Sequence, residues 1–196
     1  MCKVLVLYYS KHGKTALLAQ KIAMGIEQQG AQAIVRTVPD ITHKTEFVPD
    51  DSVPSQGHLY VTKEDLMHCD GLALGSPTHF GNMASPLKYF IDSLTDIWLK
   101  GSLVDKPACV FTSSSSMHGG QESTLLSMML PLFHHGMCIL GLPYSEPDLH
   151  TTRSGCSPYG VSSVEIVNKN KLSDEESTLA IAMGNRLARH AQKLGK

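Results

Sequence analysis

The sequence predicts an α/β protein in which a doubly wound, five-stranded parallel sheet carries helices on both faces. Five short runs of apolar and β-branched residues recur along the chain, and segments with helical spacing separate them. The chain of 196 residues is long enough to bury a substantial core and has the length of one domain. We therefore expect a single domain over residues 1–196, with ligands bound at the loops that follow the strands.

The first two strands and the helix between them are predicted from apolar runs and periodicity. Residues 3–9 read KVLVLYY, which is typical of a strand buried on both faces. Residues 15–29 carry apolar side chains three or four positions apart, so a helix is expected there, ending before Gly30. A second strand is expected at residues 32–38. Residues 39–62 hold three prolines among polar residues and are predicted to form a long loop, of a kind that is often functional or involved in assembly.

The middle of the chain adds two further strands, each followed by a polar loop. A short helix at residues 63–67 precedes a buried strand at residues 71–75, GLALG. A helix over residues 87–94 leads to the fourth strand at residues 108–113, ACVFTS. Both strands are short and apolar, as the central strands of a parallel sheet usually are.

The last part of the chain is predicted to end in a capped helix. A helix over residues 123–134 is followed by the fifth strand at residues 137–142, MCILGL. Residues 143–172 show no periodicity and are expected to be irregular. The last helix is expected over residues 173–194, because a serine and, three residues later, a glutamate form a capping box at its start.

Composition and charge exclude several functions. The net charge of −1 gives no basic surplus for nucleic acid, and no apolar run reaches the ~18 residues that span a membrane. The first residues lack the pattern of a secretory signal. Five scattered cysteines without a CxxC pair are typical of reduced thiols, so a cytoplasmic location is expected. Adjacent His134 and His135 lack further suitably spaced ligands, so no metal site is expected.

Residues 10–15, SKHGKT, lie between a strand and the start of a helix, where free N–H groups and the helix dipole favour an anion. Ser10 and Thr15 add hydroxyl groups, and Gly13 lets the backbone turn close to a ligand. The alternative is that Ser10 is a turn residue and Thr15 a helix cap. The loop lacks the dinucleotide-binding and Walker motifs, the cysteine of low-molecular-weight tyrosine phosphatases and the acidic residues of receivers. It therefore suits one terminal phosphate, as in flavin mononucleotide (FMN).

Two further loops follow the third and fourth strands. In residues 76–82, Phe80 and small polar groups offer a flat apolar face and main-chain donors for an isoalloxazine ring. The alternative is a plain turn with Phe80 packed in the core. Residues 113–120 supply hydroxyl and amide groups, or form a flexible polar loop. Trp98, the single tryptophan, is a candidate for the site or for a core or interface position.

Six stretches together carry a resemblance to a known family: KVLVLYYSKHGKT, LALGSPTHFGNMASPLKYFID, GSLVDKPACVFTS, HGGQE, HHGM and SPYG. They fall in this order between residues 3 and 160, and residues 75–83 are the most specific. On these motifs the chain resembles the tryptophan-repressor-binding-protein (WrbA) family, the type IV NAD(P)H:quinone oxidoreductases. The resemblance implies a flavodoxin-like fold with strand order 2-1-3-4-5. It also implies a homotetramer, a dimer of dimers, with active sites built at subunit contacts.

The resemblance further implies which residues hold non-covalent FMN and its substrates. His12 takes a position that contacts the nicotinamide nucleotide, and Trp98 of a neighbouring subunit would cover the substrate pocket. His134 would be the catalytic residue, by a hydrogen bond to the quinone oxygen or as a proton route. The implied cofactor-binding residues are Ser10, Lys11, His12, Gly13, Lys14, Thr15, Thr78, His79, Phe80, Ser113, Ser114, Ser115, Ser116, Met117, His118, Gly119 and His134.

The implied activity is the two-electron reduction of a small-molecule quinone, with NADH or NADPH as the donor and an association with oxidative stress. The hydride would pass from the nucleotide to FMN and then, after the nucleotide leaves, to the quinone in a ping-pong order. The alternative is a non-catalytic flavodoxin-type electron carrier or an FMN-binding regulatory adaptor. The near-neutral charge argues against a carrier, because carriers dock through strong electrostatic fields.

Overall fold

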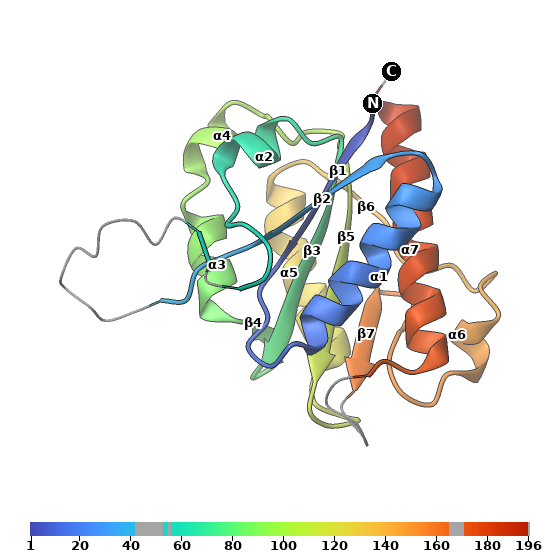
Figure 1. Ribbon diagram of the computed structural model, residues 1–196. Helices are drawn as coiled ribbons and strands as arrows, with labels where there is room; N and C mark the ends of the chain where they lie inside the picture. Colours follow the sequence, from blue (N-terminus) through green and yellow to red (C-terminus); the bar gives the residue numbers. More distant parts are fainter. Residues whose placement is uncertain (42–52, 55, 165–170, 196) are drawn as a thin grey trace.

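The computed structural model describes residues 1–41, 53–54, 56–164 and 171–195, which fold around a parallel sheet (Figure 1). In chain order the elements are β1 (Lys3–Tyr8), α1 (Lys14–Gln28), β2 (Gln32–Thr37), α2 (Lys63–Met67), β3 (Gly71–His79), β4 (Asn82–Met83), α3 (Ser85–Asp92), α4 (Thr95–Leu99), β5 (Pro107–Ser114), α5 (Gln121–His134), β6 (Cys138–Ile139), α6 (Asp148–Thr151), β7 (Val161–Val164) and α7 (Asp174–Leu194). The expected α/β architecture is confirmed.

The sheet has the predicted strand order, and helices cover both of its faces. Its main path in the described chain runs β2-β1-β3-β5-β6, with every neighbour parallel, which corresponds to the predicted order 2-1-3-4-5. Helices α1 and α7 pack on one face, and α3, α4 and α5 pack on the other (Figure 1). The carboxyl ends of β1, β3 and β5 therefore lie together at one edge, where the three polar loops begin.

Two short strands share the fifth position of the sheet, which differs from the sequence prediction. β6 pairs with Pro107 and Ala108 of β5, whereas β7 pairs with residues 111–114. The strand predicted over residues 137–142 therefore shrinks to β6, and the expected irregularity of residues 143–172 is wrong at α6 and β7. β7 reads VSSV, and its two serines hide it from a search for apolar runs.

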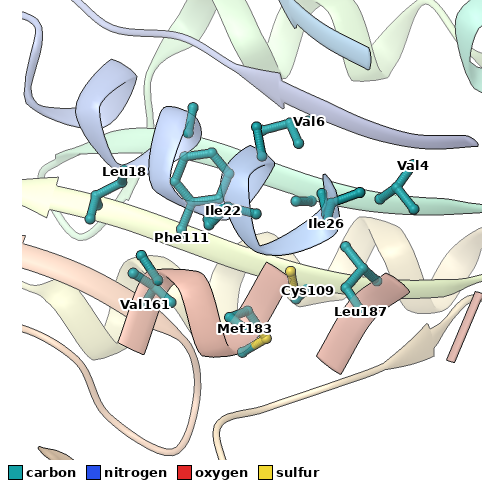
Figure 2. Packing of buried hydrophobic residues seen from close by; sticks show 14 of the residues in the cluster. Val4, Val6, Leu18, Ile22, Ile26, Cys109, Phe111, Val161, Met183 and Leu187 are labelled. Carbon is teal, nitrogen blue, oxygen red and sulfur yellow. The ribbon is translucent and has the colours of Figure 1, made fainter. Parts of the chain in front are cut away.

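Buried side chains form one core layer on each face of the sheet. Val4 and Val6 of β1 face α1 and α7, whereas Leu5 and Leu7 belong to the opposite layer. All four are at most 1% exposed, which confirms a strand buried on both faces. Figure 2 shows the first layer, where Phe111 of β5 lies among side chains from α1 and α7.

Helices α1 and α7 touch through their backbones at two glycines. A Cβ atom at Gly184 would lie 2.1 Å from the carbonyl oxygen of Ile22, and a Cβ atom at Gly25 would lie 2.1 Å from that of Ile181. Such distances are far inside van der Waals contact, so each glycine is required for this crossing.

The amino-terminal end of α7 confirms the predicted capping box and fixes β7. The Ser173 hydroxyl accepts from the Glu176 N–H at 3.1 Å, and the Glu176 carboxylate accepts from the Ser173 N–H at 3.1 Å. The same carboxylate accepts from the Ser163 hydroxyl at 2.8 Å and from the Val164 N–H at 3.0 Å. One buried acid therefore joins the last helix to the edge of the sheet.

The remaining differences concern short elements and loops. Half of the loop predicted over residues 39–62 lies outside the described residues, and the described part includes residue 60 as an isolated bridge to Thr37. The short helix α4, which carries Trp98, is absent from the sequence prediction. Within the described residues, the structure contains no helix with the length and apolar character to cross a membrane.

Candidate functional site

The three polar loops enclose a cavity of about 550 Å³ at the carboxyl ends of β1, β3 and β5. This volume is in the range of small-molecule and cofactor sites. The lining residues are Ser10, Lys11, His12, Lys14, Thr15, Pro77, Thr78, His79, Ser113, Ser114 and Ser115. The structure thus brings together residues that the sequence predicts from three separate loops, and it adds Pro77, which was not predicted.

The first loop presents hydrogen-bond donors at the start of α1. Gly13 is the N-cap residue, with a left-handed φ of 89° that favours glycine, and it has no side chain with which to cap the helix itself. The Ser10 hydroxyl oxygen accepts from the N–H groups of Gly13 at 3.1 Å and Ala16 at 3.3 Å, which leaves its own hydrogen to donate. Ser10 therefore has both of the roles that were considered for it: it shapes the turn, and it lines the cavity.

The charge of the cavity suits an anion. Lys11, Lys14, His12 and His79 line it, and no carboxylate lines it in the part of the chain that the structure describes. Lys14 is buried and donates from Nζ to the carbonyl oxygen of Lys171 at 2.6 Å, so its ammonium group is held in place. A phosphate at the helix start would meet hydroxyl groups, N–H groups and positive charge.

A hydrogen bond joins the first and third loops beneath the cavity. Thr15 Oγ1 and Ser113 Oγ lie 2.9 Å apart, and both side chains are buried. Each hydroxyl still has capacity for a further partner. Thr15 therefore connects the two loops and also lines the cavity.

The second loop is a tight hairpin that displays Phe80. His79 pairs with Asn82, and the two residues between them, Phe80 and Gly81, have φ values of 53° and 77°. Positive φ at both central residues is the pattern of a type I′ turn, which disfavours a bulky residue at the first position. Phe80 is fully exposed, so the alternative that it packs in the core is wrong. The strained turn instead holds an exposed aromatic ring next in sequence to His79, which lines the cavity.

The base of this hairpin is fixed against α5. Thr78 Oγ1 lies 2.6 Å from Thr124 Oγ1, which connects the second loop to the helix that follows the third. The remaining predicted residues of the three loops do not line the cavity, although they lie in the same loops: Gly13, Phe80, Ser116, Met117, His118 and Gly119.

His134 and Trp98 lie in a different place from this cavity. Trp98 Nε1 donates to the carbonyl oxygen of His134 at 2.8 Å, which joins α4 to the end of α5. Both residues line a second cavity of about 390 Å³, together with residues of α3 and with His135. In one chain, the structure therefore brings these two predicted site residues together with each other and not with the first cavity.

His135 is buried enough to favour its neutral form. Burial lowers the pKa of His135, and the neighbouring His134 lowers it further. Its Nδ1 atom is buried and has no hydrogen-bond partner among the described residues. The resemblance implied a catalytic role for His134 and none for His135.

Gln121, the first residue of α5, contacts the third loop and was missed by the sequence prediction. Its side chain is 4% exposed, and its Nε2 atom lies 2.7 Å from Ser114 Oγ and 2.7 Å from the Ser116 carbonyl oxygen. The signal in the sequence was the HGGQE stretch, in which a polar residue directly follows the glycine that caps the helix.

Comparison with known proteins shows relatives over the full length of the chain. Residues 2–145 match the family described as NADPH-dependent FMN reductase. The chain is 38% identical to a protein of Chromohalobacter salexigens and 37% identical to one of Gluconacetobacter diazotrophicus, each over 99% of both chains. Both relatives are named NAD(P)H dehydrogenase (quinone).

Solved structures show the same fold at lower identity. A flavodoxin, WrbA-like protein from Agrobacterium tumefaciens is similar with a TM-score of 0.71 and 22% identity, over 99% of both chains. A flavodoxin from the domain Archaea is similar with a TM-score of 0.64 and 17% identity, over 97% of this chain and 99% of the other. The predicted flavodoxin-like fold is thereby confirmed.

Proposed function

This chain belongs to the NADPH-dependent FMN reductase family, and on that premise we propose that it is an FMN-dependent NAD(P)H:quinone oxidoreductase. One observation carries the proposal: three loops at one sheet edge enclose a cavity with hydroxyl groups and positive charge, and no carboxylate among its described lining residues. The relatives that share 37–38% identity along the whole chain bear the name of this activity. The reaction is the two-electron reduction of a quinone to a hydroquinone.

The choice of FMN rests on the first loop. Ser10 offers a hydroxyl donor, Thr15 lies at the start of α1, and the helix dipole adds positive potential at the same place. These groups fit a single non-covalently bound phosphate monoester. When bound, FMN supplies two-electron redox chemistry. The loop residues of this chain hold and orient the cofactor, and Phe80 offers an exposed aromatic face next to the cavity-lining His79.

The proposed roles of Trp98 and His134 require a second copy of the chain. In one chain both line the separate cavity, so they reach a flavin only if subunits bring that surface to another subunit's first cavity. An exposed apolar stripe supports such contacts, because Leu126, Leu130 and Phe133 lie on one face of α5, the helix whose last residue Trp98 contacts. We propose a homotetramer in the cytoplasm, with His134 bonding the quinone oxygen or passing a proton.

A ligand comparison tests the FMN site. Purified protein is titrated with FMN and with riboflavin, which differ by the phosphate group. We expect FMN to bind at least about 100-fold more tightly, since charge-assisted hydrogen bonds to a phosphate are strong. Equal affinities for the two flavins would contradict the assignment of residues 10–15.

Kinetics separate the enzyme from the carrier or adaptor. Anaerobic addition of NADH or NADPH to the FMN-loaded protein should bleach the flavin rapidly, whereas no reaction would favour a carrier or adaptor. Steady-state assays with benzoquinone should give parallel double-reciprocal lines, as a ping-pong order requires. Intersecting lines would count against that order.

Mixed tetramers test whether the site is shared. Subunits carrying Ser10→Ala are co-expressed with subunits carrying Trp98→Ala. The assay uses an FMN concentration that limits the Ser10→Ala variant. If the two residues serve one site from different subunits, the mixture is more active than the average of the two homogeneous variants, because some sites then carry both natural residues. Activity equal to the average of the two homogeneous variants would show that each site is built within one chain.

A further inference from the structure

The Gln121 side chain makes three hydrogen-bond contacts with the third loop through one atom. Its Nε2 atom lies 2.7 Å from Ser114 Oγ, 2.7 Å from the Ser116 carbonyl oxygen and 2.9 Å from the Met117 carbonyl oxygen. Carbonyl oxygens only accept, so these contacts fix which end of the amide is the nitrogen. Two amide hydrogens are therefore shared among three acceptors in the same loop.

The other end of this amide is costly to bury. Gln121 Oε1 is buried and has no hydrogen-bond partner among the described residues. A buried acceptor without a partner is destabilising, and such groups are found where function retains them. Nε2 makes every contact and Oε1 makes none in the described part of the chain. A glutamine at this position is therefore explained by the geometry that it gives to the loop and not by a gain in stability.

The contacts of Gln121 determine which way the loop amides point. In a planar trans peptide the C=O and the N–H point in opposite directions. The carbonyl groups of Ser116 and Met117 point toward Gln121, so the N–H groups that follow them, of Met117 and His118, point away from it. Neither N–H donates to a protein group in the described chain, so both are available to a ligand.

We propose that Gln121 is a positioning residue that holds residues 114–118 so that the N–H groups of Met117 and His118 face the polar edge of the flavin ring. This inference rests on the proposed function, because it requires FMN in the first cavity. Gln121 touches neither cofactor nor substrate and acts through the loop. The loop also contacts itself, since Ser114 Oγ donates to the Ser116 carbonyl oxygen at 2.8 Å. Gln121 adds the link to α5.

The test replaces the amide with an acid that regains a donor at low pH. In Gln121→Glu, a carboxylate would face two carbonyl oxygens and repel them, whereas the protonated acid would donate to one. We expect FMN affinity at pH 8 to fall by about tenfold or more, and the ratio to wild type to recover at pH 5.5. The other ionisable side chains beside the loop are His79, His118 and Glu122, and wild type shares them, so their effects cancel in this ratio.

Two further variants make the result specific. Gln121→Leu keeps the approximate size without a donor, and we expect about tenfold weaker FMN binding at every pH. Gln192→Glu is the matched control, because Gln192 Nε2 also donates to a carbonyl oxygen, that of Gln29 at 2.9 Å, far from the loops. We expect this control to bind FMN as wild type does. If the leucine variant does not fold, the pH series of the glutamate variant decides alone.

The outcomes separate this inference from the function on which it rests. If wild type does not bind FMN, the proposed function is wrong. If wild type binds FMN and the ratio for Gln121→Glu stays flat between pH 5.5 and pH 8, the positioning role is overturned. A shift of the flavin absorption maximum in Gln121→Glu, reversed at low pH, would support it, because a purely structural contact would leave the spectrum of bound flavin unchanged.

Discussion

The contact between α1 and α7 allows a prediction of how a larger residue at Gly184 changes the free energy of unfolding. Packing and helix propensity act in opposite directions. In Gly184→Ala the added Cβ would lie 2.1 Å from the Ile22 carbonyl oxygen and 3.0 Å from its carbonyl carbon. These are backbone atoms of a helix, so the two helices must separate by about 1 Å or more to reach normal contact. Alanine also has the higher helix propensity, which favours the variant by about 1 kcal/mol.

The loss of packing outweighs the gain in propensity. Overpacking a well-filled core costs about 1–3 kcal/mol, and here the strain reaches buried neighbours such as Ile22 and Met183, both 0% exposed. We expect Gly184→Ala to lower the free energy of unfolding by up to about 2 kcal/mol. Urea denaturation followed by far-ultraviolet circular dichroism measures this change, provided that the slope of the transition is unchanged.

The reciprocal glycine supplies an internal control. Gly25→Ala should destabilise by a similar amount, because its Cβ would lie 2.1 Å from the Ile181 carbonyl oxygen across the same contact. The double variant should cost less than the sum of the two, since the helices have already separated. A Gly184→Ala variant more stable than wild type would refute the reasoning and show that the crossing is free to open.

Four other changes have defined outcomes. Ser10→Ala should weaken FMN binding by about tenfold through the loss of one charge-assisted hydrogen bond, measured by flavin fluorescence, and should lower the free energy of unfolding by about 1 kcal/mol because the N–H groups of Gly13 and Ala16 lose their acceptor. Phe80→Asn should raise thermal stability by up to about 1 kcal/mol, because asparagine tolerates the left-handed φ of 53°, while quinone turnover falls; lower stability would show that the turn is not strained. Glu176→Ala should lower the free energy of unfolding by about 3 kcal/mol, because buried donors on β7 and at the start of α7 lose their acceptor. Urea titration measures this change, and a loss well below about 3 kcal/mol would contradict the prediction. Burial lowers the pKa of His135 below 6.5, so the unfolded chain binds more protons and stability should fall as the pH drops below about 6.5; His135→Gln should flatten this slope in urea titrations across pH 5–7.5.

The sequence was sufficient for the fold where local pattern and burial agree. β1 and β5 are continuous apolar runs because both of their faces are covered, and α1 shows helical spacing because one stripe faces the sheet. β7 was missed because its serines are buried by tertiary hydrogen bonds, such as that from Ser163 to Glu176, which no local pattern reveals. The capping box of α7 was found since all of its groups lie within four residues.

The candidate site could also be predicted in part from the sequence. Loops at strand ends could be assigned from glycine, serine and threonine at the start of a helix, and the structure brings them to one cavity. The contact between Trp98 and His134 joins residues 36 positions apart, so the sequence alone could not place them in a second cavity. Gln121 was missed because its importance lies in its contacts with carbonyl groups, to which residue type gives no guide.

The divided fifth strand also has a consequence for solubility. A long, flat strand at the border of a sheet invites strands from other molecules to add to it, which is one route to aggregation. Here that border consists of two residues in β6 and four in β7, separated by residues 140–160, which leave the sheet and return. An approaching strand therefore finds no continuous row of free N–H and C=O groups on this side. Removing the excursion to join the two pieces would expose such a row.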